Sequence, residues 1–323
     1  METAKKKTVL SVCLFVVIFA GLLITATFTD LQVSKILVDL EPGCYFTDNI
    51  FGAVFESIGS SPAYLFLAAA FAIIFANTAR AENKALKYLG SIAANGAAIA
   101  AMYVCLNDVV RYANEHLDCE SVTGAGYFKI LVIVLAVALA EGCCAVFLKK
   151  VDPATAKALL KFSFVVIFAV ALSNLIINVV VKNIMCRPRY RAMWALGDTE
   201  FTNFHRWYQK FYMPEEGDPL FIAAVQGNAV GHDAYRSFPS GHTNAAGTVY
   251  TLLVLPMLLK KYDTKKWRAL LLVISIGITG IVAVSRIVCG AHFFSDVLVG
   301  GTIMFLCTLL GAKLFIRKDF EKV

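Results

Sequence analysis

The sequence predicts an all-α integral membrane protein, a bundle of about eight helices that each cross the bilayer. Apolar residues make up 59% of its 323 residues and charged residues only 16%, whereas ordinary soluble domains carry about 25% charged residues. The mean hydropathy is +0.69, and several uncharged stretches approach the roughly 20 residues that a spanning helix needs. This composition excludes intrinsic disorder and argues against a soluble enzyme, whose surface could not cover so many apolar side chains.

Eight stretches are apolar enough to cross the membrane. Seven carry no charged residue, and the remaining one carries only Glu141. We expect spanning helices at 8–29, 62–79, 88–107, 130–148, 162–181, 243–259, 269–285 and 297–312. The first stretch follows three lysines, as a signal peptide does, but its apolar run is too long, so we expect a retained anchor.

The basic residues predict the orientation of these spans. If the N-terminus is cytoplasmic, 19 of the 30 Lys and Arg residues fall in cytoplasmic segments, as the positive-inside rule requires. Both termini of this multi-pass protein are then cytoplasmic. Because topology explains most of the net charge of +7, we expect no nucleic-acid partner. We expect one domain, 1–323, and the lipid bilayer as its surroundings.

Three polar stretches interrupt the apolar sequence at the ends of predicted spans. They occupy 182–191 after the fifth span, 237–242 before the sixth, and 285–296 between the seventh and the eighth. In the predicted topology all three lie on the extracytoplasmic side of the membrane. They can therefore meet in one site.

The residue types in these stretches predict a phosphate site. Lys182, Arg189 and Arg286 bring positive charge, and the planar guanidinium group matches phosphate oxygens. Ser240 and Gly241 begin a helix, where free N–H groups and the helix dipole favour an anion. These five residues predict a clamp for a phosphate group.

Two histidines and a carboxylate complete the set. His292 and Asp296 are four residues apart, so on a helix they share a face and the carboxylate can hold one imidazole nitrogen. The other nitrogen is then free to attack phosphorus, while His242 protonates the leaving oxygen and later activates water. The predicted chemistry is phosphoryl transfer through a phosphohistidine. No cysteine or histidine spacing is typical of a metal site, so we expect no metal and no cofactor.

These stretches resemble the signature of the type-2 phosphatidic acid phosphatase family. The first motif, Lys, six residues, Arg-Pro, matches at Lys182 and Arg189, except that Tyr190 replaces the proline; Arg187 is an alternative phosphate contact. The second motif, Pro-Ser-Gly-His, matches fully at 239–242, and the third, Ser-Arg, five residues, His, three residues, Asp, matches fully at 285–296. The resemblance covers about 162–312.

The resemblance implies a core of six spans, with two spans added to it, and metal-independent dephosphorylation at an outward-facing site. The two additional spans are either the first pair or the third and fourth. The resemblance also implies that His292 is the nucleophile and that His242 is the general acid and base. It implies that the phosphate group is bound by Lys182, Arg189, Ser240, Gly241 and Arg286. The family includes phosphatases of phosphatidate, undecaprenyl pyrophosphate, phosphatidylglycerophosphate and sugars, so its motifs define the reaction better than the substrate.

We expect a lipid-phosphate substrate, isoprenoid or glycerolipid, because a headgroup in the outer leaflet lies level with these helix ends. A phosphatase of soluble sugar phosphates, similar to glucose-6-phosphatase, and a non-catalytic lipid-phosphate binding or transport protein are the alternatives. Vanadate-dependent peroxidases share the clamp but are typically soluble. The aromatic outer segment 182–242 is either an interfacial anchor or a lid. The oligomeric state and a disulfide between Cys44 and Cys119 stay open.

Overall fold

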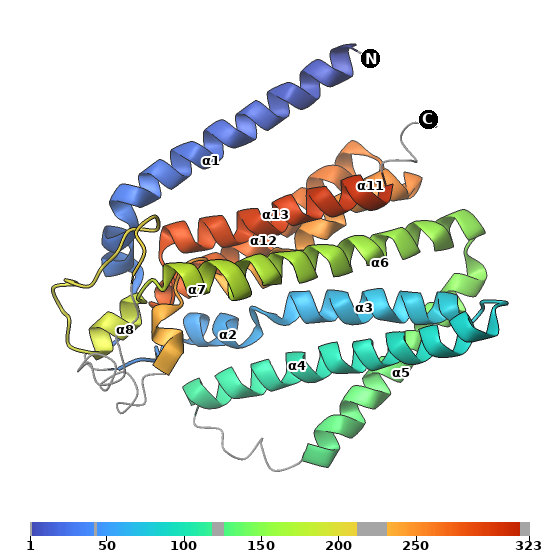
Figure 1. Ribbon diagram of the computed structural model, residues 1–323, viewed down its shortest axis with the longest axis horizontal. Coiled ribbons are helices and arrows are strands. Elements are labelled where there is room, and N and C mark those ends of the chain that lie inside the picture. Colours follow the sequence, from blue (N-terminus) through green and yellow to red (C-terminus); the bar gives the residue numbers. More distant parts are fainter. Residues whose placement is uncertain (1, 42–43, 118–125, 212–230, 317–323) are drawn as a thin grey trace.

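The computed structural model describes residues 2–41, 44–117, 126–211 and 231–316. Within these ranges every regular element is a helix, and the predicted all-α membrane bundle is confirmed (Figure 1). Seven helices there are long and apolar enough to cross a membrane, and each overlaps one of the predicted spans. They are Leu10–Leu37, Ile50–Thr78, Leu86–Asn114, Ile130–Lys150, Pro153–Met185, Lys265–Val288 and Phe294–Ile316.

The described helices are of three kinds: α-helical, π-helical and 3₁₀. The α-helices are α1 (Glu2–Leu37), α2 (Ile50–Ile58), α3 (Ser61–Thr78), α4 (Ser91–Leu117), α5 (Gly126–Lys150), α6 (Pro153–Asn174), α7 (Lys182–Met185), α8 (Tyr190–Ala195), α10 (Gly241–Ala246), α11 (Leu255–Leu258), α12 (Lys265–Val288) and α13 (Phe294–Ile316). Two π-helical turns, η1 (Leu86–Gly90) and η3 (Leu175–Val181), continue into α4 and α7. The 3₁₀ helices are η4 (Gly231–Tyr235), η5 (Gly247–Val254) and η6 (Lys260–Tyr262).

The predicted span 243–259 is the one that is not among those seven helices. It is helical without a break from Gly241 to Leu258, but α10 and α11 are joined by the 3₁₀ helix η5. A 3₁₀ helix rises about 2.0 Å per residue, against about 1.5 Å in an α-helix. The composite helix therefore reaches roughly 30 Å, the thickness of the hydrocarbon layer, and we interpret it as the eighth crossing.

The outer connection expected between the first two spans is largely helical. α1 continues to Leu37, and Ile50–Ile58 form α2, whose N-cap Asn49 accepts a hydrogen bond from the Gly52 N–H at 3.1 Å. Residues 31–37 extend the first span to the end of α1. As a result Asp30 and Glu56, 2% and 0% exposed, become buried.

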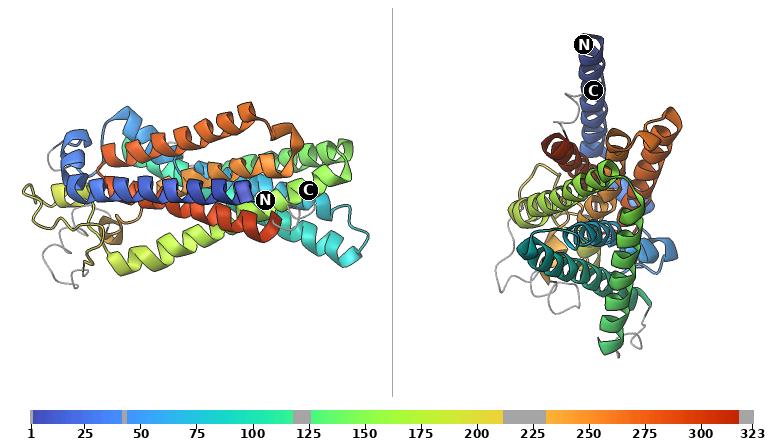
Figure 2. Two further views of the ribbon diagram at one scale, coloured as in Figure 1. Left: turned by 90° about the horizontal axis from the view of Figure 1, so that it is seen from above. Right: turned by 90° about the vertical axis from the view of Figure 1, so that its right-hand side faces the viewer.

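The bundle has a central group of helices and a periphery. α3, α6 and α13 run side by side along the long axis, while α1 and α5 lie at the outside and α1 diverges from the bundle toward its N-terminal end (Figures 1 and 2). The beginning of α1 and the end of α13 lie at the end of the bundle opposite α8 (Figure 1). α8 and the start of α13 therefore lie at the same end of the bundle (Figure 1).

α13 and the start of α10 touch through their backbones at Gly300. A Cβ atom at this position would overlap the Ser240 backbone, whose carbonyl carbon and nitrogen would both lie 3.2 Å away. One turn earlier the Ser240 N–H donates a hydrogen bond to the Asp296 carbonyl oxygen at 3.0 Å. Gly300 therefore allows the second and third polar stretches to meet.

We expect Gly300→Ala to lower the free energy of unfolding by about 1–3 kcal/mol, because neither backbone can yield easily. Gly301→Ala is the matched control, since its Cβ would only make ordinary contact with Thr279 Cγ2 at 3.5 Å. Each change replaces a glycine within α13 by alanine, so the difference in helix propensity cancels when the two variants are compared. Unfolding in detergent measures the difference, and equal stability of the two variants would contradict the close approach.

Candidate active site

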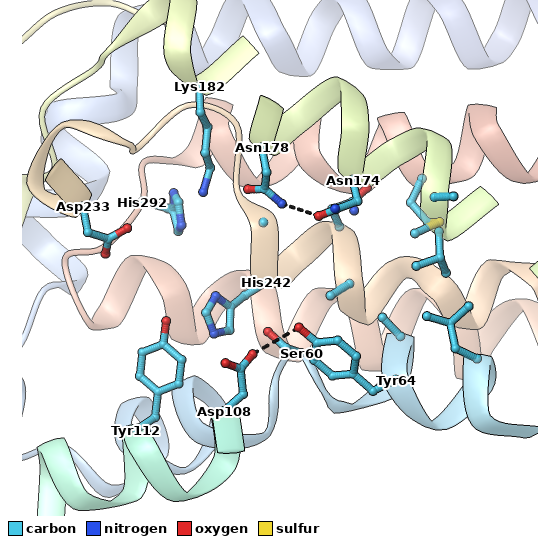
Figure 3. Close-up of a pocket in the computed structure, with 18 of the residues that line it drawn as sticks. Ser60, Tyr64, Asp108, Tyr112, Asn174, Asn178, Lys182, Asp233, His242 and His292 are labelled. Atoms are coloured by element: carbon cyan, nitrogen blue, oxygen red, sulfur yellow. Dashed lines mark hydrogen bonds between the residues drawn. The ribbon is translucent and has the colours of Figure 1, made fainter. Parts of the chain in front are cut away.

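A cavity of about 510 Å³ opens among α3, α4, α6 and α10, at the end of the bundle near α8 (Figure 3). Five of the residues expected in the phosphate site line it: Lys182, Arg189, Gly241, His242 and His292. The other four, Arg187, Ser240, Arg286 and Asp296, are buried and do not line the cavity. The cavity lining thus includes residues from all three polar stretches.

His292 lies in the turn between α12 and α13, two residues before α13 begins. Its Nδ1 is 2.6 Å from the Ser237 carbonyl oxygen and 3.7 Å from Asp296 Oδ2. The expectation that His292 and Asp296 share a helix face is wrong, because His292 precedes the helix. The nearest acceptor for Nδ1–H is the Ser237 carbonyl, and this assignment of the tautomer leaves the lone pair on Nε2.

The environment of His292 keeps its imidazole neutral. Burial lowers the pKa of His292 to about 3; the nearby Asp296 opposes this shift, and the positive charges of Arg189, Arg286 and Lys182 reinforce it. A neutral imidazole with a free Nε2 lone pair is the form that can act as a nucleophile.

Asp296 holds the turn around His292. Its Oδ2 accepts hydrogen bonds from Ser237 Oγ and, at 2.8 Å, from the Phe293 N–H. Its Oδ1 accepts one from Arg187 Nη1 at 2.6 Å. Asp296 therefore positions Ser237, whose carbonyl in turn orients the imidazole.

Arg187 is a buried structural residue and does not line the cavity. Its guanidinium donates to Asp30 Oδ2 at 2.9 Å, as well as to Asp296, to Ser295 Oγ at 2.9 Å and to the His205 carbonyl at 2.7 Å. The guanidinium carbon also lies 4.2 Å from the centroid of the Phe293 ring. These contacts use donors from all three nitrogens of the group.

Arg189, two residues later, lines the cavity. Its Nη2 donates to Asp233 Oδ1 at 2.8 Å, whereas its Nε and Nη1 have no partner among the described residues. Burial alone would raise the pKa of Asp233, but Arg189, Lys182 and Arg191 hold it below its usual value. Asp233 is therefore anionic and fixes one edge of Arg189 while the other edge keeps free donors.

Arg286 is fully buried and is fixed by an acid that the motifs do not include. Glu56 Oε1 accepts hydrogen bonds from Arg286 Nη2 at 2.8 Å and from Arg191 Nη1 at 3.0 Å. Nε and Nη1 of Arg286 have no partner in the part of the chain that the structure describes. Glu56 thus fixes one edge of the Arg286 guanidinium, while Nε and Nη1 of Arg286 stay available to donate hydrogen bonds to an anion.

The Pro-Ser-Gly-His stretch supplies the remaining groups. Ser240 caps α10, since its Oγ accepts from the Thr243 N–H at 3.3 Å, and it is not among the cavity-lining residues. At Gly241 a Cβ would lie 3.4 Å from Lys182 Nζ, so glycine leaves room for the ammonium group. The ring of His242 packs edge-on against Tyr112, with 5.1 Å between centroids, and its Nε2 has no partner among the described residues.

Other candidate residues lie away from this site. Glu141 accepts a hydrogen bond from Asn95 Nδ2 at 2.8 Å, between α5 and α4. Cys119, the candidate partner of Cys44, lies outside the described residues, so their pairing stays open. Among the residues that the structure describes, no group of three or more His, Cys, Asp or Glu side chains is arranged to hold a metal ion.

Residues 162–319 match the family model described as the PAP2 superfamily. The chain belongs to this superfamily. The match covers about half of the chain and contains all three polar stretches. No curated protein and no solved structure matches the chain. Membership of the PAP2 superfamily and the seven membrane-length helices support a phosphatase in a multi-pass membrane protein.

Several residues of this PAP2 site were not found from the sequence. Asp30 and Glu56 lie before the matched range, and Asp233 lies in the outer segment between the first two motifs. Acids next to or inside apolar spans are costly to bury and are functional candidates for that reason. The position of Asp30 and Glu56 close to apolar spans could therefore have marked them as candidates. Asp233 lies in a polar segment, where an acid does not stand out.

We expect Arg187→Ala and Arg189→Ala to differ in stability. The first change leaves Asp30 and Asp296 buried without their partner, which typically costs about 3–5 kcal/mol. The second costs less, because Asp233 is 35% exposed and keeps Lys182 nearby. Thermal unfolding in detergent measures both variants, and a larger loss in Arg189→Ala would contradict the two assignments.

We expect His292 to stay neutral far below pH 6.5. Because its pKa is lowered to about 3, its imidazole ¹⁵N signals should keep the pattern of the Nδ1–H tautomer from pH 8 to about pH 5. Nuclear magnetic resonance of histidine-labelled protein, assigned with His292→Asn, tests this. A titration of His292 centred near pH 6.5 would refute the neutral nucleophile.

Proposed function

We propose that the protein is a membrane phosphatase that removes phosphate from lipid phosphates, either phosphomonoesters or pyrophosphates of isoprenoid or glycerolipid alcohols. The observation that carries this proposal is the composition of the cavity. One end holds His292, His242, Lys182 and Arg189, while the other is lined by apolar side chains: Leu67, Phe71, Ile167, Val170 and Met304. A phosphate group fits the first end and a hydrocarbon chain the second.

The reaction proceeds in two displacements. His292 Nε2 attacks phosphorus, the N–P bond forms, and the P–O bond to the leaving group, an alcohol or, for a pyrophosphate, the lipid monophosphate, breaks as His242 donates a proton to the leaving oxygen. His242 then accepts a proton from water, whose oxygen attacks phosphorus; the N–P bond breaks, His292 is regenerated and inorganic phosphate leaves. No metal ion takes part in either step.

Fixed positive charge stabilises both transition states. Lys182 and Arg189 line the cavity, Arg286 is close enough to Lys182 to interact with it electrostatically, and both arginines keep donors without a partner among the described residues. Because Asp233 and Glu56 already hold these arginines in place, little reorganisation is needed when negative charge develops on the phosphoryl oxygens.

The site faces the extracytoplasmic side in this proposal, with both termini in the cytoplasm. Arg189, the N-cap of α8, lines the cavity, and α8 and the end of α5 lie at opposite ends of the bundle (Figure 1). Lys149 and Lys150 end α5. Lys260 and Lys261 lie between α11 and α12, in a connection that is cytoplasmic in the predicted topology. The positive-inside rule supports this orientation.

The decisive experiment is phosphate release by the purified protein in detergent, with His292→Ala beside it. The substrates are phosphatidate, lysophosphatidate, undecaprenyl pyrophosphate, phosphatidylglycerophosphate and glucose 6-phosphate. We expect release from lipid substrates and a loss of at least about a thousandfold in the variant, which lacks the nucleophile. Release from glucose 6-phosphate alone would favour the sugar phosphatase, and binding without release would favour a transport protein.

Chelation and vanadate test the reaction type. We expect EDTA to leave the rate unchanged, because in this mechanism His292 supplies the nucleophile and the Lys and Arg side chains stabilise the charge, both of which a metal ion provides in metal-dependent phosphatases. We expect vanadate to inhibit, since it adopts the five-coordinate geometry of the transition state and fits the same clamp. A rate abolished by EDTA and restored by a divalent metal would refute the mechanism.

A further inference from the structure

Between the cationic end and the apolar end of the cavity lies a belt of polar side chains that the two displacements do not use. On one side Tyr64 Oη donates a hydrogen bond to Asp108 Oδ2 at 3.3 Å; on the other Asn178 Nδ2 donates to Asn174 Oδ1 at 2.6 Å (Figure 3). All four residues line the cavity. We call these four residues the polar collar.

The collar lies about one helical turn from the reacting groups. Asn178 precedes Lys182 by four residues, and Asp108 precedes Tyr112, which packs against His242, by four residues. In α4 the four residues from Asp108 to Tyr112 rise about 6 Å, and the π-helical turn η3, which contains Asn178, ends directly before Lys182. When a phosphate group occupies the clamp, the first carbons of its alcohol therefore reach the collar, and the rest of the chain reaches the apolar end.

A carboxylate at this level does not suit a purely hydrocarbon chain. Asp108 is 26% exposed and its Oδ1 lies 3.5 Å from Nη2 of the more exposed Arg111, while Oδ2 faces Tyr64 in the cavity. Filling the cavity with methylene groups would remove water from this carboxylate without replacing its hydrogen bonds. A hydroxyl or ammonium group on the substrate would replace them.

We propose that the polar collar is a specificity subsite that binds a hydrogen-bond donor, a hydroxyl or an ammonium group, carried next to the phosphate by a long-chain alcohol. This inference rests on the proposed phosphatase function and narrows its substrate class. Long-chain phosphomonoesters with a free donor near the phosphate are preferred over plain isoprenoid phosphates and over fully acylated glycerol phosphates. Tyr64 and Asp108 precede the range matched by the family model, so this selectivity is separate from the shared motifs.

The test uses three substrates of equal chain length in the same mixed micelles: hexadecyl phosphate, 2-hydroxyhexadecyl phosphate and 2-aminohexadecyl phosphate. The measurement is kcat/KM for phosphate release. For the wild-type protein we expect a preference of at least about tenfold for a donor-bearing substrate over hexadecyl phosphate, as for a hydrogen bond to a charged group. The second and third substrates distinguish a hydroxyl from an ammonium donor.

Two variants and a control connect the preference to the collar. Asp108→Asn removes the charge but keeps the size, so the preference for the amine should fall to near one and that for the hydroxyl should fall less. Tyr64→Phe removes one hydrogen bond and should reduce both preferences, which keeps the test valid if Asp108→Asn does not fold. Glu82→Gln changes an exposed acid outside the cavity and should keep the wild-type ratios.

Equal kcat/KM for the three substrates in the wild-type protein would overturn the inference while leaving the phosphatase intact. Unchanged preferences in both Asp108→Asn and Tyr64→Phe would also overturn it. No release from any of the three substrates, in wild-type and His292→Ala protein alike, would instead refute the proposed phosphatase function and the subsite with it.

Discussion

The buried pairing of Arg187 with Asp30 and Asp296 is the interaction on which the site depends. Arg187 lies between α1 and the start of α13 and binds both Asp30 and Asp296. Asp296 accepts a hydrogen bond from Ser237 Oγ, and the Ser237 carbonyl oxygen contacts Nδ1 of His292. Burying an unpaired charge costs several kcal/mol per ion. The first helix, which lies outside the family match, is thereby fastened to the residue that we assign as nucleophile.

Arg187 differs from the two buried arginines of the predicted phosphate clamp, Arg189 and Arg286. All three nitrogens of the Arg187 guanidinium donate hydrogen bonds to protein acceptors, so this group stabilises the fold. Arg189 and Arg286 each have one edge held by an acid, Asp233 or Glu56, and keep donors without a partner. A cation that is fixed but incompletely bonded is the form in which charge stabilises a developing anion most effectively. The same sequence run, Arg-Pro-Arg, thus supplies one structural guanidinium and one that lines the cavity.

The sequence predicted much of the fold because apolar runs of membrane length and motif spacing are local signals. The seven membrane-length helices overlap predicted spans, and the cavity collects Lys182, Arg189, Gly241, His242 and His292. The pairings of Asp30 and Glu56 could not be predicted, because each joins residues more than 100 positions apart with no local pattern. The orientation of His292 was missed because it depends on where α13 begins, two residues beyond the histidine. The 3₁₀ section of the sixth span likewise follows from packing and not from composition.

The covalent intermediate on His292 is the central claim, and trapping it is the most direct test. Brief incubation with substrate labelled in its phosphate, followed by alkaline denaturation, preserves a phosphohistidine and permits peptide mapping. We expect label on the peptide that contains His292, more of it in His242→Ala because hydrolysis of the intermediate is slowed, and none in His292→Ala. Turnover without label at His292, or label on His242 instead, would contradict the assignment of the nucleophile.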